Sequence, residues 1–198
     1  MVKIVIKRKI KDFNKVIHVD GDKSLSIRSL LIGSQSYGLC KIKNLPLSGD
    51  ILSTINGLKK LGVKILFKNN ISLIYGNGLN GFNYKKNILI NAGNSGTFAR
   101  LLLGLLIKCP YEIKIIGDPS LSKRDFLRII SPLEKFGAQF KCKNKGRLPL
   151  KILGSKFLKP VNYFEKRGSA QCKSSIILAA LNTPGKTIIN AKKSRDHT

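Results

Sequence analysis

Apolar positions recur along this chain with two different periods. Some short runs place an apolar residue at every second position, as residues 2–7 do, and this period is typical of β-strands. Longer stretches space their apolar residues three and four positions apart, which predicts amphipathic helices. We expect strands at residues 2–7, 15–19, 40–44, 63–67, 72–75, 87–91, 112–116 and 186–190, with two more around Phe140 and Leu150. We expect helices at residues 24–36, 50–62, 95–108, 124–136 and 169–181.

These elements recur as three copies of one pattern. The copies start near Ser24, Gly96 and Ser169, and each start is followed by a cation and an apolar run. In the first two copies an aspartate, Asp50 or Asp125, then opens a second helical pattern. The repeat length of roughly 70 residues exceeds that of common solenoids, so each copy is a unit of several elements.

The order of elements predicts an α/β fold. Each unit is β-α-β-α-β-β, and we expect a pseudo-threefold domain whose third unit is truncated. We expect Asp50 to cap its helix and Gly62 to end it. The Asn69-Asn70 pair between two alternating runs predicts a hairpin.

Composition adds a strong positive charge. The 198 residues carry a net charge of +27, with lysine outnumbering arginine and scattered singly or in pairs. We interpret this as a solvated basic surface that raises encounter rates with anionic metabolites, and we expect no nucleic-acid partner. The four cysteines are far apart and form no CxxC motif, so we expect no metal site. With no signal peptide or membrane-spanning apolar run, the expected location is the cytoplasm.

The starts of the repeated helices carry the candidate chemistry. Ser24 and Arg28 lie one turn apart, Gly96 brings the backbone within reach of a ligand, and Ser169 opens the third start. Free backbone N–H groups at a helix start attract anions. A serine or arginine at one helix start is usually only a cap or a solvated charge, so the prediction depends on three equivalent starts converging. The turns before the second helices add Ser122, Lys123, Arg124, Ser194 and Arg195. Together they predict one face suited to phosphate and carboxylate groups.

Five ordered motifs resemble those of 5-enolpyruvylshikimate-3-phosphate synthases, the 3-phosphoshikimate 1-carboxyvinyltransferases. The resemblance covers essentially the whole chain but only about the first half of the family's length. The motifs are Gly21-Asp-Lys-Ser-Leu-Ser-Ile-Arg28, Asn91-Ala-Gly-Asn-Ser-Gly-Thr97 with Arg100, Gly117-Asp-Pro-Ser-Leu-Ser-Lys-Arg124, Ser169-Ala-Gln-Cys-Lys-Ser174 and Ser194-Arg-Asp-His-Thr198.

The resemblance implies a two-domain enzyme with its active site in the cleft between domains built from three such units. Residues 1–20 would supply strands to the other domain, residues 21–198 would form an incomplete substrate-binding domain, and the second domain would be absent. The family transfers the enolpyruvyl group of phosphoenolpyruvate to the 5-hydroxyl of shikimate 3-phosphate, through a tetrahedral intermediate and without cofactors. We expect a monomer when the protein is complete.

Residue roles follow from the same resemblance. Lys23 would contact both substrates. The expected shikimate 3-phosphate ligands are Lys23, Ser24, Arg28, Ser169, Ala170, Gln171, Ser194 and Arg195. The expected phosphoenolpyruvate ligands are Lys23, Gly96, Arg124 and Gln171. Ala170 replaces a serine found in many members, and we expect Arg195 to compensate at the phosphate.

Two further expectations concern activity. The family's acid and base residues belong to its second half, so we expect this polypeptide alone to be an inactive N-terminal fragment. Alanine at the position of Gly96 is associated in this family with insensitivity to glyphosate, so the resemblance implies a sensitive complete enzyme.

Three alternatives remain open at this point. The first is the sister transferase acting on UDP-N-acetylglucosamine, which resembles Lys-Asn rather than Lys23-Ser24 in the first motif. The second is a basic RNA-binding module, which requires aromatic residues interleaved with clustered cations. The third is a non-catalytic relic of the enzyme.

Overall fold

The structure is a computed structural model that describes residues 19, 21–143 and 146–191. The strand expected at residues 2–7 lies outside the described residues, as do residues 15–18 of the next expected strand. Ser194 and Arg195 also lie outside them.

The first unit contains two helices and a three-stranded sheet. The sheet has the order β1-β3-β2 and is antiparallel throughout. The predicted hairpin is confirmed, because β2 and β3 pair across Asn69 and Asn70, whose φ angles of 47° and 59° are left-handed. The elements are α1 (Lys23–Gln35), β1 (Tyr37–Lys43), α2 (Gly49–Lys60), β2 (Lys64–Lys68) and β3 (Ile71–Asn77).

The second unit repeats this topology with one additional strand. Its sheet has the order β4-β5-β7-β6, in which β4 is parallel to β5 and the other pairs are antiparallel. Strands β5, β7 and β6 therefore correspond to β1, β3 and β2. The elements are β4 (Leu89–Asn91), α3 (Gly96–Leu105), β5 (Ile113–Ile116), α4 (Pro119–Ser122), α5 (Leu127–Lys135), β6 (Gln139–Lys143) and β7 (Arg147–Leu153).

The described part of the third unit contains β8 (Asn162–Glu165), α6 (Ala170–Ala180) and β9 (Ile188–Ala191). Strand β8 pairs with β9 in parallel, as β4 pairs with β5. The sequence analysis missed β8, because four residues shortly after Pro160 are too few to establish a period. This recurrence of one topology confirms the predicted α/β fold of repeated units.

Two helix starts differ from the prediction. Ser48 occupies the N-cap of α2, and Asp50 lies in the first turn. Helix α5 begins at Leu127 rather than at residue 124, because the preceding residues form the separate helix α4. Proline at the first position of α4 and the Asp118 carboxylate, which accepts a 2.6 Å bond from the Leu121 N–H, favour this extra helix.

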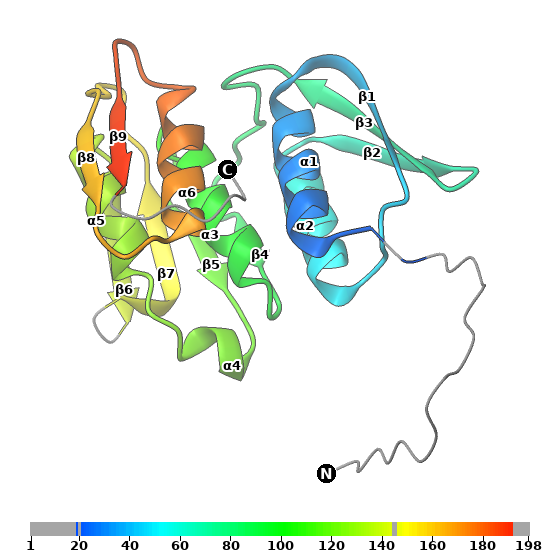
Figure 1. Cartoon of the computed structure of the whole chain (residues 1–198), viewed down its shortest axis with the longest axis horizontal. Helices are drawn as coiled ribbons and strands as arrows, with labels where there is room; N and C mark the ends of the chain where they lie inside the picture. Colours follow the sequence, from blue (N-terminus) through cyan, green and yellow to red (C-terminus); the bar gives the residue numbers. More distant parts are fainter. Residues whose placement is uncertain (1–18, 20, 144–145, 192–198) are drawn as a thin grey trace, which may run out of the picture.

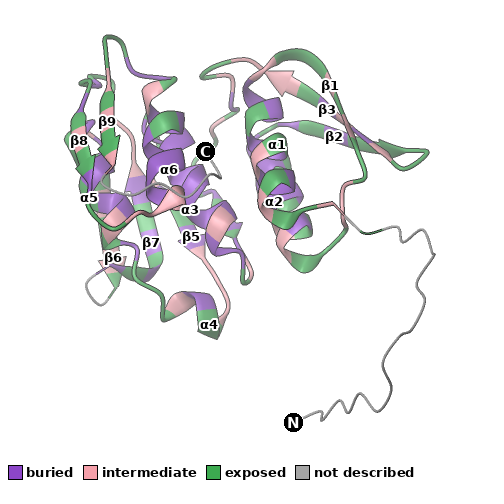
Figure 2. Ribbon diagram, viewed as in Figure 1, coloured by how far each residue is buried: buried purple, intermediate pink, exposed green. Residues whose placement is uncertain are grey.

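Helix α3 lies in the middle of the core. All of its residues from Phe98 to Leu105 are buried, and it lies side by side with α6 (Figures 1 and 2). Helix α2 packs on α1 and α3, and α5 packs on α3 and α6. Helices α1 and α6 border an apolar groove of about 260 Å³ whose lining includes Leu31, Ile32 and Ile177.

Helices α3 and α6 approach closely because α3 has a glycine at the crossing. A Cβ atom added at Gly104 would lie directly against the backbone carbonyl oxygen of Ser175. The Ser175 hydroxyl in turn donates a 3.0 Å hydrogen bond to the Arg100 carbonyl oxygen. A side chain at position 104 would therefore push the two helices apart.

We expect Gly104→Ala to lower the free energy of unfolding by about 2–3 kcal/mol, because backbone rather than a flexible side chain must move. Gly49→Ala is the matched control, since a Cβ at Gly49 meets nothing within 4 Å. That variant should stay within about 0.5 kcal/mol of the wild type. Urea denaturation measures both, and equal stability of the two variants would contradict the close crossing.

Candidate anion-binding site

Helices α1, α3 and α6 begin with the same type of N-cap hydrogen bond. The side chains of Asp22, Ser95 and Ser169 each accept a hydrogen bond from the backbone N–H three residues further on, at 2.7, 3.3 and 3.3 Å. The N-caps of α1 and α3 are therefore Asp22 and Ser95 rather than Ser24 and Gly96, whereas Ser169 is itself the N-cap of α6. Arg28, Arg100 and Lys173 consequently lie at different distances from their caps, which corrects the spacing expected from the sequence.

A cavity of about 410 Å³ opens where α1, α3 and α6 begin. Among the described residues that line it, four are arginines and none is acidic. Such a cavity favours an anion that accepts several hydrogen bonds at once. The lining residues are Ser24, Arg28, Thr97, Arg100, Arg128, Arg167, Gly168, Ser169, Ala170 and Gln171.

Arg100 is the most constrained of these cations. Its side chain donates to the Gln171 Oε1 atom at 2.6 Å and to the Asp125 carbonyl oxygen at 3.1 Å, and it lies over the Phe126 ring at 5.1 Å. Burial, followed by the charges of Arg128 and Arg124, lowers the pKa of Arg100 to about 10. Arg100 therefore remains charged at neutral pH and is held in one orientation.

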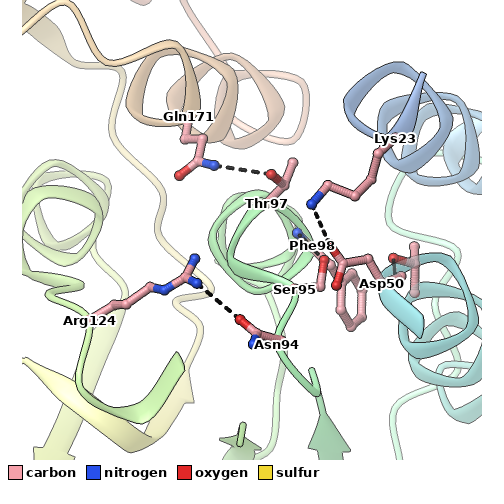
Figure 3. A network of polar contacts seen from close by, with 9 residues as sticks. Lys23, Asp50, Asn94, Ser95, Thr97, Phe98, Arg124 and Gln171 are labelled. Atoms are coloured by element: carbon pink, nitrogen blue, oxygen red, sulfur yellow. Dashed lines mark hydrogen bonds and ion pairs between the residues drawn. The ribbon is translucent and has the colours of Figure 1, made fainter. Parts of the chain in front are cut away.

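Gln171 is oriented from both ends of its amide. Its Oε1 atom accepts from Arg100, and its Nε2 atom donates a 3.0 Å hydrogen bond to the Thr97 hydroxyl (Figure 3). The amide therefore links the first turns of α3 and α6.

Arg28 is fixed in a similar way. It donates to the Ser174 hydroxyl at 3.0 Å and to the Ser24 carbonyl oxygen at 3.2 Å. Burial lowers the pKa of Arg28, while the Asp22 carboxylate raises it. Helix α1 therefore presents a cation to the cavity that is already anchored on α6.

The other predicted ligands that the structure describes, Lys23, Gly96 and Arg124, lie around the start of α3. Lys23 forms a 2.8 Å ion pair with Asp50 of α2, and Arg124 donates a 3.0 Å hydrogen bond to the Asn94 side chain (Figure 3). A Cβ at Gly96 would lie 3.1 Å from the Arg124 Nη1 atom and 3.4 Å from the Arg100 Nη1 atom. Gly96 and Arg124 are thus neighbours, as expected, although neither lines the cavity itself.

The structure therefore places Ser24, Arg28, Ser169, Ala170 and Gln171 in one cavity. Thr97 belongs to a recognised motif but was assigned no role. Arg128 and Arg167 were missed, because an arginine in a helix start or a loop has no period that separates it from a solvated charge.

The described part of the chain has neither a cluster of metal-ligating side chains nor a membrane-spanning helix. No three His, Cys, Asp or Glu side chains there come together as metal ligands. Within the same residues, no helix has the length and hydrophobicity needed to cross a bilayer.

The family model for EPSP synthase (3-phosphoshikimate 1-carboxyvinyltransferase) matches residues 7–198. This chain belongs to the EPSP synthase family. The predicted resemblance is thereby confirmed.

Individual EPSP synthases agree with this match. The 3-phosphoshikimate 1-carboxyvinyltransferase of Vesicomyosocius okutanii is 44% identical over 184 residues, which cover 92% of this chain and 42% of the relative. That of Caldicellulosiruptor saccharolyticus is 42% identical over 202 residues, which cover 100% of this chain and 45% of the relative. A solved structure of EPSP synthase from Acinetobacter baumannii superposes with a TM-score of 0.85 at 37% identity, covering 92% of this chain and 41% of that one. The chain therefore spans less than half the length of these relatives.

We expect Arg100→Lys to lower the free energy of unfolding by about 2–3 kcal/mol, because one ammonium group does not satisfy both Gln171 and the Asp125 carbonyl. Arg124→Lys is the control, because the Arg124 side chain is exposed and donates its hydrogen bond to the Asn94 side chain. It should cost less than about 0.5 kcal/mol. Equal losses in urea denaturation would show that the buried network is not a stabilising unit.

Proposed function

We propose that this chain supplies the shikimate 3-phosphate site of an EPSP synthase. The cavity at the starts of α1, α3 and α6 carries this proposal, because it gathers Ser24, Arg28, Ser169 and Gln171 within an arginine-rich lining. Four guanidinium groups offset the charge of a phosphate dianion, while hydroxyl groups and the Gln171 amide suit the hydroxyls of a small carbocycle.

The neighbouring group around Gly96 suits a second anion. Arg124, Lys23 and the first turn of α3 lie beside the cavity, and phosphoenolpyruvate placed there would come next to the bound phosphorylated acceptor. Two multiply charged anions repel each other, so fixed cations are needed before the enolpyruvyl group can pass to the 5-hydroxyl.

Substrate binding and proton transfer belong to different parts of the complete enzyme in this proposal. The described residues supply binding groups, while proton transfer at a vinyl carbon and a hydroxyl requires positioned acids and bases. We propose that residues outside this chain provide them, so that this polypeptide binds shikimate 3-phosphate without turnover. The cytoplasmic location and the monomeric state of the complete protein remain predictions.

The alternatives are weaker candidates. The family match does not favour the UDP-N-acetylglucosamine transferase or an RNA-binding module. An RNA-binding role predicts tight binding to RNA at near-physiological salt, and we expect that binding to disappear there.

We expect the chain to bind shikimate 3-phosphate in isothermal titration calorimetry and to bind shikimate, which lacks the phosphate, much more weakly. Arg28→Ala should weaken shikimate 3-phosphate binding at least tenfold, roughly the value of one charge-assisted hydrogen bond. The control is Arg147→Ala, which removes an exposed arginine of β7 that does not line the cavity. Equal affinity of wild type and Arg28→Ala for shikimate 3-phosphate would contradict the assignment.

We expect Gly96→Ala to change ligand binding rather than stability. The added Cβ would displace the mobile end of Arg124 by a few tenths of an ångström, so the free energy of unfolding should stay within about 0.5 kcal/mol of wild type. In a complete enzyme containing this chain, the displaced guanidinium should raise both the KM for phosphoenolpyruvate and the glyphosate concentration needed for inhibition. If the KM for phosphoenolpyruvate and the inhibitory glyphosate concentration both stay unchanged, Gly96 is not part of the phosphoenolpyruvate site.

A further inference from the structure

A buried carboxylate lies directly behind the anion-attracting cavity. Glu165, the last residue of β8, is only 3% exposed and is not a lining residue. A buried negative charge near an anion site opposes anion binding electrostatically. A carboxylate at this position therefore needs a favourable role that offsets its repulsion of an anion.

Both oxygens of Glu165 hold backbone N–H groups of the turn that leads into α6. The Oε1 atom accepts from the Arg167 N–H at 3.1 Å, and the Oε2 atom accepts from the Ser169 N–H at 2.9 Å. Gly168, between these two residues, has a φ of 66°, in the left-handed region that favours glycine. The carboxylate thus closes the turn from both sides of this glycine.

The residues fixed by this turn are those that form one wall of the cavity. Residues 167–170 all line it, and the Ser169 hydroxyl also caps α6 through the Cys172 N–H. A change in the turn would therefore move the Arg167 guanidinium, the Ser169 hydroxyl and the first N–H groups of α6 together.

We propose that Glu165 is a positioning residue for anion binding, which acts by holding the turn at residues 166–169 in the conformation that faces the ligand. It does not touch the ligand. This inference rests on the proposed function of the cavity, and it extends the site to a residue that the resemblance does not include.

The Glu165→Gln substitution separates positioning from electrostatics by the sign of its effect. Loss of a negative charge alone would strengthen anion binding. Glutamine, however, retains one acceptor oxygen and turns an NH₂ group toward the second backbone N–H, so one end of the turn is released. A positioning role therefore predicts weaker binding despite the more favourable charge.

The test titrates the full chain with inorganic phosphate and, separately, with shikimate 3-phosphate at constant ionic strength. We expect Glu165→Gln to weaken phosphate binding roughly tenfold, as for the loss of one charge-assisted hydrogen bond. Glu134→Gln is the matched control, because it removes the same charge from an exposed position of α5. It should leave the dissociation constant for phosphate within about twofold of wild type.

Phosphate binding to Glu165→Gln that equals or exceeds that of wild type would overturn the inference. If this variant does not fold, hydrogen exchange of the wild type decides. The Arg167 and Ser169 amides should then be protected relative to that of the exposed Lys166, and their unprotected exchange would overturn the positioning role.

The two ligands keep this inference separate from the proposed function. A wild type that binds phosphate but not shikimate 3-phosphate contradicts the proposed substrate, and the effect of Glu165→Gln on phosphate still supports or overturns the positioning role. A wild type that binds neither anion overturns both.

Discussion

The close approach of α3 and α6 is the contact on which both the core and the candidate site depend. Gly104 permits this approach, and the Ser175 hydroxyl stabilises it through a 3.0 Å hydrogen bond to the Arg100 carbonyl oxygen. The same approach brings Gln171 within reach of Arg100 and Thr97 at the starts of the two helices. The packing of α3 against α6 in the core therefore also sets the geometry of the cavity at their starts. A helix that shifts at its middle also shifts at its first turn.

The arginines of the cavity are prepared for an anion by contacts that do not neutralise them. Arg28 and Arg100 donate to hydroxyl, amide and carbonyl oxygens, which orient a guanidinium group without cancelling its charge. Lys23, by contrast, is paired with Asp50 at the edge of the site. Preorganised cations reduce the reorganisation that binding a dianion requires. The chain belongs to the EPSP synthase family, and this arrangement is the basis of the proposed shikimate 3-phosphate site.

Much of the fold could be predicted because its signals are local. The hairpin at Asn69-Asn70, the C-terminal glycine of α2 at Gly62 and the five long helices follow from turn chemistry and apolar period. The errors occurred where local signals compete or are too short. Proline and aspartate at the start of α4 separated it from α5, and the four residues of β8 became a strand only by pairing with β9.

The sequence by itself determined the repeated unit, the family and four of the candidate site residues, Ser24, Arg28, Ser169 and Gln171. Motifs and apolar periods can be recognised from the order of residues alone. Only the tertiary structure decided that Asp22, Ser95 and Ser169 cap α1, α3 and α6, and that Thr97, Arg128 and Arg167 line the same cavity as those four residues. It also placed the two oxygens of Glu165 where they accept from the Arg167 and Ser169 N–H groups, beside that cavity. The shared cavity arises from separate units packed side by side, and contacts between distant segments leave no periodic pattern in the chain. The caps and the Glu165 contacts are local, but which side chain accepts a given N–H depends on a backbone conformation that the periods do not specify.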